Sequence, residues 1–174
     1  MPPLGGDTLF AGMYAAYDSL SDGLKATLET MQPVHSSSHI FGAAAIAADR
    51  DENEARYKNA AAATQEAIHT VVIRHPVSGR RALYVNDHFA LRFEGWTEDE
   101  SAPLLRYLRE VETRPENVFR LHWEPGTLAL WDNRSTWHCA VNDYHGHRRL
   151  MHHITMEDCA LEAAALERTS RRHP

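Results

Sequence analysis

The side chains best suited to chemistry lie in one stretch near the C-terminus, WHCAVNDYHGHRRLMHHITM, residues 137–156. It holds five histidines and two arginines, and imidazoles bind transition metals while guanidinium groups bind carboxylates. Residues two apart in a β-strand share a face, so Arg149 and His153 should point the same way. His138 lies eleven residues before Arg149, across a turn. The pattern predicts a pocket that joins a metal-binding imidazole to a carboxylate-binding guanidinium.

The elements that would position this pocket can be predicted from turn residues and apolar spacing. The segment DTLFAG predicts a short strand, and residues 13–31 predict two helices separated by Ser21. A β-hairpin is expected around the turn at residues 76–79, and Thr97 begins a capping box at the start of a helix. Further strands are expected in VFRLHW, TLALWD, the stretch around 137–141, and RRLMHHITM. The remaining histidines of this region and the tail are interpreted as surface residues: His145, His147, His152 and His173.

Composition indicates one globular domain over residues 1–174. Hydrophobic residues make up 43% of the chain, and 18 Lys and Arg against 24 Asp and Glu give a net charge of −6. Nucleic acid is therefore not an expected partner, and no apolar run is long enough to cross a bilayer. Cys139 and Cys159 fit neither a Cys-x-x-Cys motif nor a disulfide framework, which indicates a cytoplasmic setting. Residues 44–67 are interpreted as a variable surface excursion, and residues 160–174 as a C-terminal tail.

A family resemblance rests on the C-terminal motifs. The segment from Glu124 to Thr155, EPGTLALWDNRSTWHCAVNDY followed by RRLMHHIT, resembles the taurine dioxygenase-like (TauD/TfdA) family of Fe(II)- and 2-oxoglutarate-dependent dioxygenases. The resemblance continues upstream through HPVSGRRALYVN, the helix that Thr97 opens, LGGDTLFA and AAYDSLSDGLK. It covers nearly the whole chain, from about Pro3 to Met156.

The resemblance implies a mainly β fold with helices, the double-stranded β-helix or jelly roll, that holds Fe(II) on two histidines and one carboxylate. His138 resembles the distal iron-binding histidine. Arg149 resembles the arginine near the 2-oxoglutarate carboxylate, and Thr8 resembles the threonine that hydrogen-bonds the same cosubstrate. The implied reaction hydroxylates a small anionic organic substrate, a sulfonate, sulfate ester or aryloxy acid, as in taurine catabolism. The resemblance also implies a homo-oligomer.

Two departures from the family pattern affect this expectation. The family's other iron ligands form a His-x-Asp pair before the Gly-Gly-Asp-Thr motif, and no matching pair occurs in this sequence. The resemblance therefore predicts a jelly roll that is incomplete at its N-terminus, a fragment without two iron ligands and without turnover of its own. His153 stands where the family has the arginine that salt-bridges the distal carboxylate of 2-oxoglutarate. A mostly neutral imidazole has no bidentate fork, so cosubstrate affinity should be lower.

Two other functions remain open on the sequence. The first is a non-catalytic pseudoenzyme or a jelly-roll interaction module that keeps the fold without the metal. The second is a cupin-like metal site, which requires at least two further histidines to converge on His138. The candidates for that convergence are His35, His39, His88 and His122.

Overall fold

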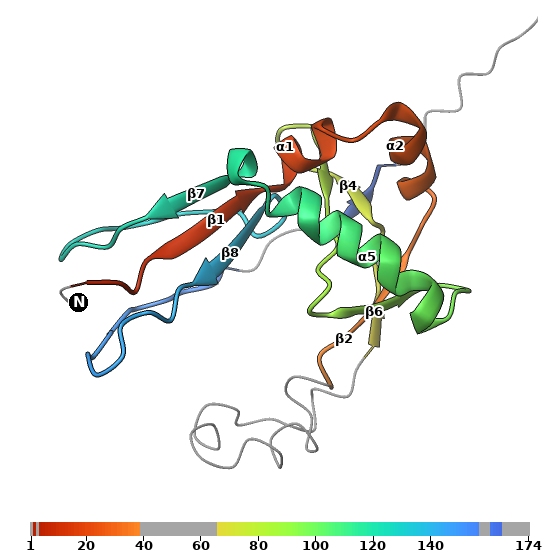
Figure 1. The fold of residues 1–174 in the computed structure, drawn as a ribbon. Helices are drawn as coiled ribbons and strands as arrows, with labels where there is room; N and C mark the ends of the chain where they lie inside the picture. The colour runs from red at the N-terminus through yellow and green to blue at the C-terminus, as the bar shows by residue number, and fades with distance from the viewer. Residues whose placement is uncertain (1, 3, 39–65, 157–160, 165–174) are drawn as a thin grey trace, which may run out of the picture.

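The computed structural model describes residues 2, 4–38, 66–156 and 161–164, and within these ranges the chain is mainly β with helices (Figure 1). The first part of the chain contains β1 (Thr8–Gly12), α1 (Met13–Asp18), α2 (Asp22–Leu28), β2 (Pro33–Ser36) and β3 (Glu66–Ile68). The middle part contains β4 (Val72–Arg74), β5 (Arg81–Leu83), β6 (Ala90–Phe93) and α5 (Glu98–Glu112). A 3₁₀ turn (Pro115–Asn117), β7 (Val118–Leu121), β8 (Thr136–Ala140) and β9 (Glu162–Ala163) follow.

The described strands form three antiparallel sheets, each of three strands. Their orders are β7-β1-β8, β3-β2-β6 and β5-β4-β9. The β7-β1-β8 sheet extends away from the helices, while α1, α2 and α5 gather around β4 and β6 at the other end of the molecule (Figure 1). In the first sheet the central strand β1 pairs with β7 on one side and β8 on the other, and each of these strands lies more than a hundred residues after β1 in the sequence.

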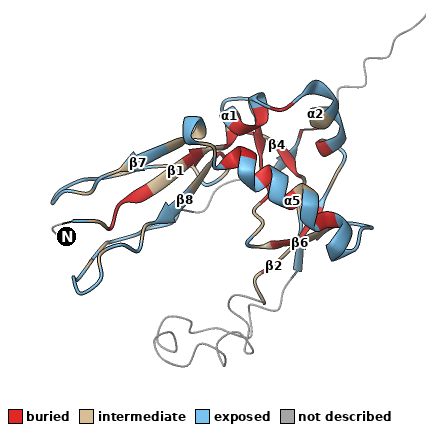
Figure 2. Cartoon of the chain, viewed as in Figure 1, coloured by how far each residue is buried: buried red, intermediate tan, exposed pale blue. Residues whose placement is uncertain are grey.

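The hydrophobic core lies at the helical end. Its fully buried members come from α1, α2, α5 and strands β4, β5 and β6, and they include Met13, Leu28, Ile73, Leu83, Phe93, Leu108 and Val111. Figure 2 shows the buried colour concentrated on α1, β4 and the inner side of α5, whereas β7 and β8 are largely exposed. The sheet that carries the predicted pocket is therefore the least covered part of the molecule.

Several local predictions are confirmed. DTLFAG contains β1, and Ser21 separates the two helices as the N-cap of α2, where its hydroxyl accepts a hydrogen bond from the Leu24 amide. The hairpin of β4 and β5 forms around residues 76–79. Thr97 and Glu100 form the reciprocal capping box of α5. Each of these features depends on residues close together in the sequence, which is why the local pattern was sufficient.

Two predicted strands are wrong. Residues 127–132 (TLALWD) and 148–156 (RRLMHHITM) are not strands in the structure, although both segments have suitable composition. An extended segment becomes a strand only when its backbone pairs with a neighbour. The part of the chain that the structure describes offers neither segment a pairing partner.

The predicted surface excursion and tail are only partly described. Residues 44–65 lie outside the described ranges, whereas Glu66 and Ala67 belong to β3 and are exposed. Of the predicted tail, residues 161–164 are described. Within them β9 pairs with β4, and Ala164 is buried in the core. None of the described helices is long and apolar enough to cross a membrane.

Candidate active site

His138 lies on the same face of the β7-β1-β8 sheet as Thr8. In the antiparallel pairing of β1 with β8, Phe10 is opposite His138 and Thr8 is opposite Ala140. Cross-strand partners project from the same face, and so do residues two apart in one strand. Thr8 and His138 are therefore separated by one two-residue step, about 7 Å along the strands.

Arg149 reaches the same face from the segment that follows β8. Its Nη2 donates to the Thr8 hydroxyl oxygen over 3.4 Å, and its Nε donates to the carbonyl oxygen of Gly6 over 2.9 Å. The Thr8 hydroxyl oxygen also accepts a 2.9 Å hydrogen bond from the indole N–H of Trp123. The structure thus brings together the predicted pair, Thr8 and Arg149, a hydroxyl and a guanidinium suited to a carboxylate.

The backbone at Gly6 permits this approach. Gly6 has a φ of +71°, and a Cβ atom there would lie 3.1 Å from Cδ of Arg149. A side chain at this position would be strained by its backbone and would press against the arginine. The amide of Gly6 donates to the Asp143 carboxylate over 2.7 Å, which fixes the loop before β1.

His153 lies beside His138 and Trp131. Its ring stacks on the Trp131 indole at an interplanar angle of 15° and a centroid distance of 5.6 Å. The rings of His138 and His153 are 6.3 Å apart, and the ring of His138 is 4.9 Å from that of Trp131. Partial desolvation lowers the pKa of His138, although the residue is exposed, and the charge of His153 lowers it further. A lowered pKa favours the neutral imidazole, which is the form that binds metals.

The turn before β8 is held by an ionic and hydrogen-bonded network. The Asp132 carboxylate accepts hydrogen bonds from the backbone amide and the guanidinium of Arg134, and from Nε2 of His75 over 2.9 Å. These donors, Arg134 first, hold the pKa of Asp132 well below its usual range. The other ring nitrogen of His75 accepts from the amides of Val77 and Ser78, so the proton is on Nε2.

His75 was missed by the sequence reasoning as a contributor to this site, although it begins the motif HPVSGRRALYVN. It lies 57 residues before Asp132, and neither residue's spacing indicates the contact. Asp132 would have been suggested as the partner of His75 only if the two family motifs that contain them were known to lie close together. Trp123 was missed for the same reason, since its bond to Thr8 spans 115 residues.

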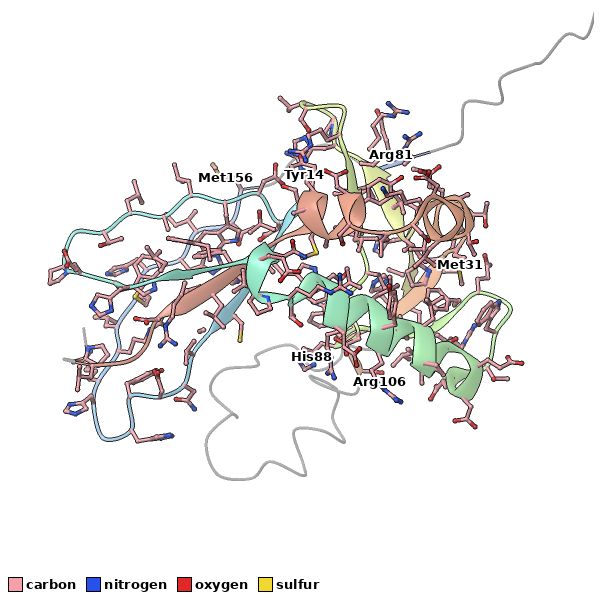
Figure 3. All side chains as sticks on the ribbon, turned by 45° about the horizontal axis from the view of Figure 1, so that its top comes forward. Tyr14, Met31, Arg81, His88, Arg106 and Met156 are labelled. Carbon is pink, nitrogen blue, oxygen red and sulfur yellow. The ribbon has the colours of Figure 1, made fainter. Side chains whose placement is uncertain are left out.

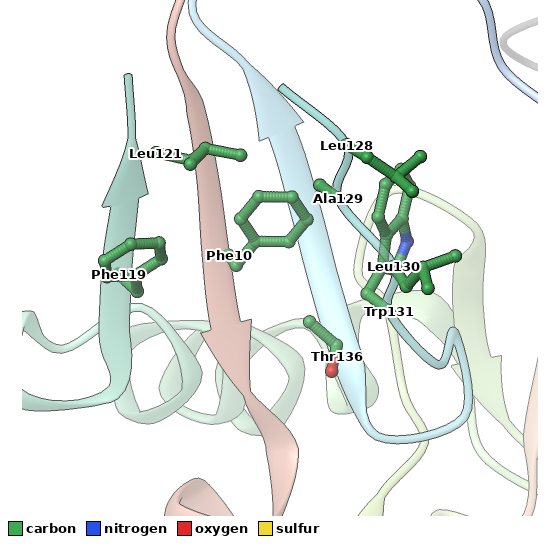
Figure 4. A pocket seen from close by; sticks show the side chains of 8 residues that line it. All are labelled: Phe10, Phe119, Leu121, Leu128, Ala129, Leu130, Trp131 and Thr136. Carbon is green, nitrogen blue, oxygen red and sulfur yellow. The ribbon is translucent and has the colours of Figure 1, made fainter. Parts of the chain in front are cut away.

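The face that carries His138 is otherwise apolar and open. Phe10, Phe119, Leu121, Leu128, Leu130 and Trp131 surround a cavity of about 460 Å³ (Figure 4), and we call these six residues the open face. Leu128 and Leu130 are each 82% exposed, and Phe119 is 63% exposed. The polar groups of the site therefore lie at the edge of an uncovered apolar surface.

The described residues do not by themselves fit an iron ion. No group of three His, Cys, Asp or Glu side chains within the described ranges is placed to hold a metal, and a ferrous site of this type needs two histidines and one carboxylate. His138 supplies one imidazole. The cupin-like alternative finds no support in the described part of the chain, and His39 lies outside it.

Comparison with known proteins agrees with the motifs and the fold. The family described as "Taurine catabolism dioxygenase TauD, TfdA family" matches residues 1–155. An alkylsulfatase of Acinetobacter baylyi is 37% identical over 156 residues, which cover 90% of this chain and 49% of the relative. An alpha-ketoglutarate-dependent sulfate ester dioxygenase of Pseudomonas putida is 36% identical and is covered over 51% of its length. The chain thus spans about half the length of the curated relatives it matches.

Solved structures also match this chain over about half of their own length. A taurine dioxygenase from Burkholderia xenovorans has 34% identity and a TM-score of 0.66, and the match covers 82% of this chain and 44% of that one. The enzyme AAD-2, crystallised with Mn(II) and N-oxalylglycine, matches with 32% identity, a TM-score of 0.62, and coverage of 83% and 53%. These neighbours are jelly-roll dioxygenases, which confirms the predicted fold class. The chain belongs to the taurine catabolism dioxygenase TauD/TfdA family.

Proposed function

We propose that this chain carries part of the active site of an Fe(II)- and 2-oxoglutarate-dependent dioxygenase that acts on a small anionic organic compound. The observation that carries the proposal is that Arg149, from the segment after β8, contacts Thr8 on the face of the β7-β1-β8 sheet that also carries His138. The related enzymes named for sulfate esters, sulfonates and 2,4-dichlorophenoxyacetate support a substrate with an anionic group. The cysteine pattern supports a cytoplasmic location.

Each residue has a defined task in this proposal. Arg149 and Thr8 bind a carboxylate of 2-oxoglutarate, Arg149 through a charge-assisted hydrogen bond and Thr8 through its hydroxyl. His138 is one metal ligand of the complete site, and His153 lines the same face next to it. In the overall reaction 2-oxoglutarate and O₂ give succinate and CO₂, and the second oxygen atom enters the substrate as a hydroxyl group. The described residues lack two of the three metal ligands, so we assign this turnover to a completed site.

Binding of 2-oxoglutarate to the 174-residue chain tests the carboxylate pair. Arg149→Ala should weaken binding at least tenfold in a calorimetric titration, because it removes the only guanidinium that contacts Thr8 in the described structure. Arg148→Ala is the matched control, since Arg148 is the adjacent arginine and is exposed. Equal losses in the two variants would show that the affinity is non-specific charge attraction and would overturn the assignment.

Turnover by the chain alone gives the second test. With Fe(II), ascorbate, O₂ and a panel of taurine, alkyl sulfates and aryloxyacetates, we expect no succinate above the no-enzyme background. One imidazole leaves the metal without a fixed geometry for the cosubstrate. Succinate formation that His138→Ala abolishes would show instead that this chain contains a complete metal site.

A further inference from the structure

We propose that His35 and His69 bind one Zn²⁺ ion between strands β2 and β3, at a site separate from the candidate active site. The ion would tie β3, an outer strand in the described β3-β2-β6 sheet, to its neighbour β2. The two histidines belong to neither the carboxylate pair nor the ring cluster around His138, so this inference can hold or fail independently of the proposed function.

The histidine pair lies in another part of the fold than the candidate active site. His35 belongs to the β3-β2-β6 sheet, whereas His138 belongs to the β7-β1-β8 sheet. Figure 1 shows β2 and β6 away from β7, β1 and β8. In Figure 3, Met31, which shortly precedes β2, lies at the helical end, and Met156, at the end of the segment that carries Arg149, lies at the other. A metal bound at this pair is therefore distinct from the expected iron.

The register of β2 and β3 brings the two imidazoles together. His35 is opposite Ala67 in this antiparallel pair, and the backbone N–H of His69 donates to the Pro33 carbonyl oxygen over 3.3 Å. Because His69 comes two residues after Ala67, it projects from the same face as His35. The two ring centroids are 5.3 Å apart. Both side chains are partly exposed, so an ion from solution can reach them.

The separation of the rings suits one shared zinc ion. Two imidazoles on a tetrahedral zinc ion, with Zn–N bonds of about 2.0–2.1 Å, have ring centroids about 5 Å apart. The rings of His35 and His69 are inclined by 56° and are not stacked. Tyr84 meets the His69 ring edge-on, at 5.7 Å and 88°, and burial raises the pKa of its hydroxyl. Tyr84 therefore remains a neutral phenol that orients His69.

His35 also carries a buried atom that needs a partner. Its Nδ1 has no hydrogen-bond partner among the described residues, and such an atom usually indicates a water molecule or an ion. Burial lowers the pKa of His35 to about 4, the charge of His69 lowers it as well, and the carbonyl oxygen of Pro33 opposes the shift only in part. At neutral pH the imidazole is therefore uncharged, which is the form that binds metals.

The ligand set favours zinc over the hard divalent cations. Imidazole nitrogens suit Zn²⁺, whereas Ca²⁺ and Mg²⁺ take oxygen ligands. No third His, Cys, Asp or Glu within the described ranges completes a group with the pair, so water fills the remaining positions. We therefore expect binding that is weaker than at a zinc site with four protein ligands.

Zinc titration against a chromophoric chelator tests the proposal. The full chain, without a histidine tag, carries His138→Ala throughout, so that the expected iron ligand cannot contribute. We expect one Zn²⁺ per chain, with no competition from Ca²⁺ or Mg²⁺. His35→Gln and His69→Gln should each weaken zinc binding at least tenfold, and the double variant should lose little more, because both rings bind one ion. His145→Gln, at an exposed position after β8, is the matched control and should change the affinity less than twofold.

A second measurement leaves both histidines in place and covers a variant that folds poorly. In ¹H–¹⁵N spectra of the His138→Ala chain, one equivalent of Zn²⁺ should shift the ring nitrogens of two histidines. The melting temperature should rise with zinc and return to its first value with EDTA. Two results would overturn the proposal: zinc affinity that neither glutamine variant changes, or spectra in which zinc shifts no histidine or shifts many histidines equally.

Discussion

Gly6 is the residue at which the backbone makes room for the carboxylate-binding pair. Its φ is positive, and a Cβ atom at this position would lie 3.1 Å from Cδ of Arg149, so the arginine side chain would have to shift. Gly79 has a similar φ of +67°, but a Cβ atom there would have no neighbour within 4 Å. A substitution at Gly79 therefore measures the free-energy cost of backbone strain alone, whereas one at Gly6 adds the cost of displacing Arg149.

We expect Gly79→Ala to lower the free energy of unfolding by about 1–2 kcal/mol, the cost of a left-handed non-glycine residue. Gly6→Ala should cost about 1 kcal/mol more than this, because Arg149 must move, and it should also weaken 2-oxoglutarate binding. Urea unfolding and calorimetry on both variants measure the two effects. If Gly79→Ala weakens binding to the same extent, the effect of Gly6→Ala does not act through Arg149.

Asn133 has a structural role at the same scale. Its side-chain oxygen accepts a 2.8 Å hydrogen bond from the indole N–H of Trp131, which orients a ring that contacts both His138 and His153. Asn133→Ala should lower the free energy of unfolding by about 1 kcal/mol and leave 2-oxoglutarate affinity within twofold. A loss of affinity without a change in melting temperature would contradict this assignment.

At the scale of elements, α5 combines a stabilising start with an unfavourable end. The Thr97 capping box satisfies amides of its first turn, but Glu112 in its last turn is only 1% exposed and its Oε1 has no hydrogen-bond partner among the described residues. Burial raises the pKa of Glu112 well above 4.5, and the charge of Asp87 raises it further. The folded chain therefore favours the protonated form of this carboxyl group more strongly than the unfolded chain does.

The pH dependence follows from the direction of that shift. Unfolding lets Glu112 ionise above its ordinary pKa of 4.5, so the stability of the folded chain is complete below that pH and falls as the pH rises towards the folded value. Glu112→Gln should stabilise the chain by about 1–3 kcal/mol at pH 8 and by much less at pH 4.5. Urea unfolding at both pH values would show this, with exposed Glu110→Gln as the control. A gain for Glu112→Gln that does not depend on pH would contradict the ionisation.

At the scale of the whole molecule, the contact between His75 and Asp132 joins the β4–β5 hairpin to the turn that leads into β8. It links the covered, helical end of the structure to the open sheet. The side chains of His75 and Asp132 are 8% and 36% exposed, whereas both side chains of the Asp18–Arg80 ion pair are more than half exposed. Exposed pairs contribute little to stability because water screens them.

We predict a coupling energy of about 1–2 kcal/mol between His75→Gln and Asp132→Asn in a double-mutant cycle at pH 7. The cycle of Asp18→Asn with Arg80→Gln should give less than about 0.5 kcal/mol. Hydrogen bonds from Arg134 and His75 lower the pKa of Asp132 in the folded chain. The stability that the ionised Asp132 contributes is therefore present above pH 3.8, its ordinary pKa, and is lost as the pH falls below that value. The loss of unfolding free energy caused by Asp132→Asn should therefore be smaller at pH 3 than at pH 7. Equal coupling in both cycles would show that the contact of His75 with Asp132 does not link the two parts.

The sequence by itself determined the features that depend on near neighbours and on strand alternation. The Ser21 and Thr97 caps, the β4–β5 hairpin and β1 follow from short-range hydrogen bonding and turn residues. The family motif also predicted that Arg149 and His138 would lie near Thr8, and the register and the Arg149 contact agree, although the segment of Arg149 is not the strand from which its direction was predicted. Their roles in binding metal and cosubstrate remain predictions.

Only the tertiary structure decided which extended segments become strands and which side chains complete the site. Residues 127–132 and 148–156 have the right composition, but pairing requires a partner that local sequence does not specify. The bonds of His75 to Asp132 and of Trp123 to Thr8 span 57 and 115 residues, so they exist only once the sheets are assembled. The open face has the same origin, because apolar alternation predicts a buried face and only the assembled fold shows whether another layer covers it.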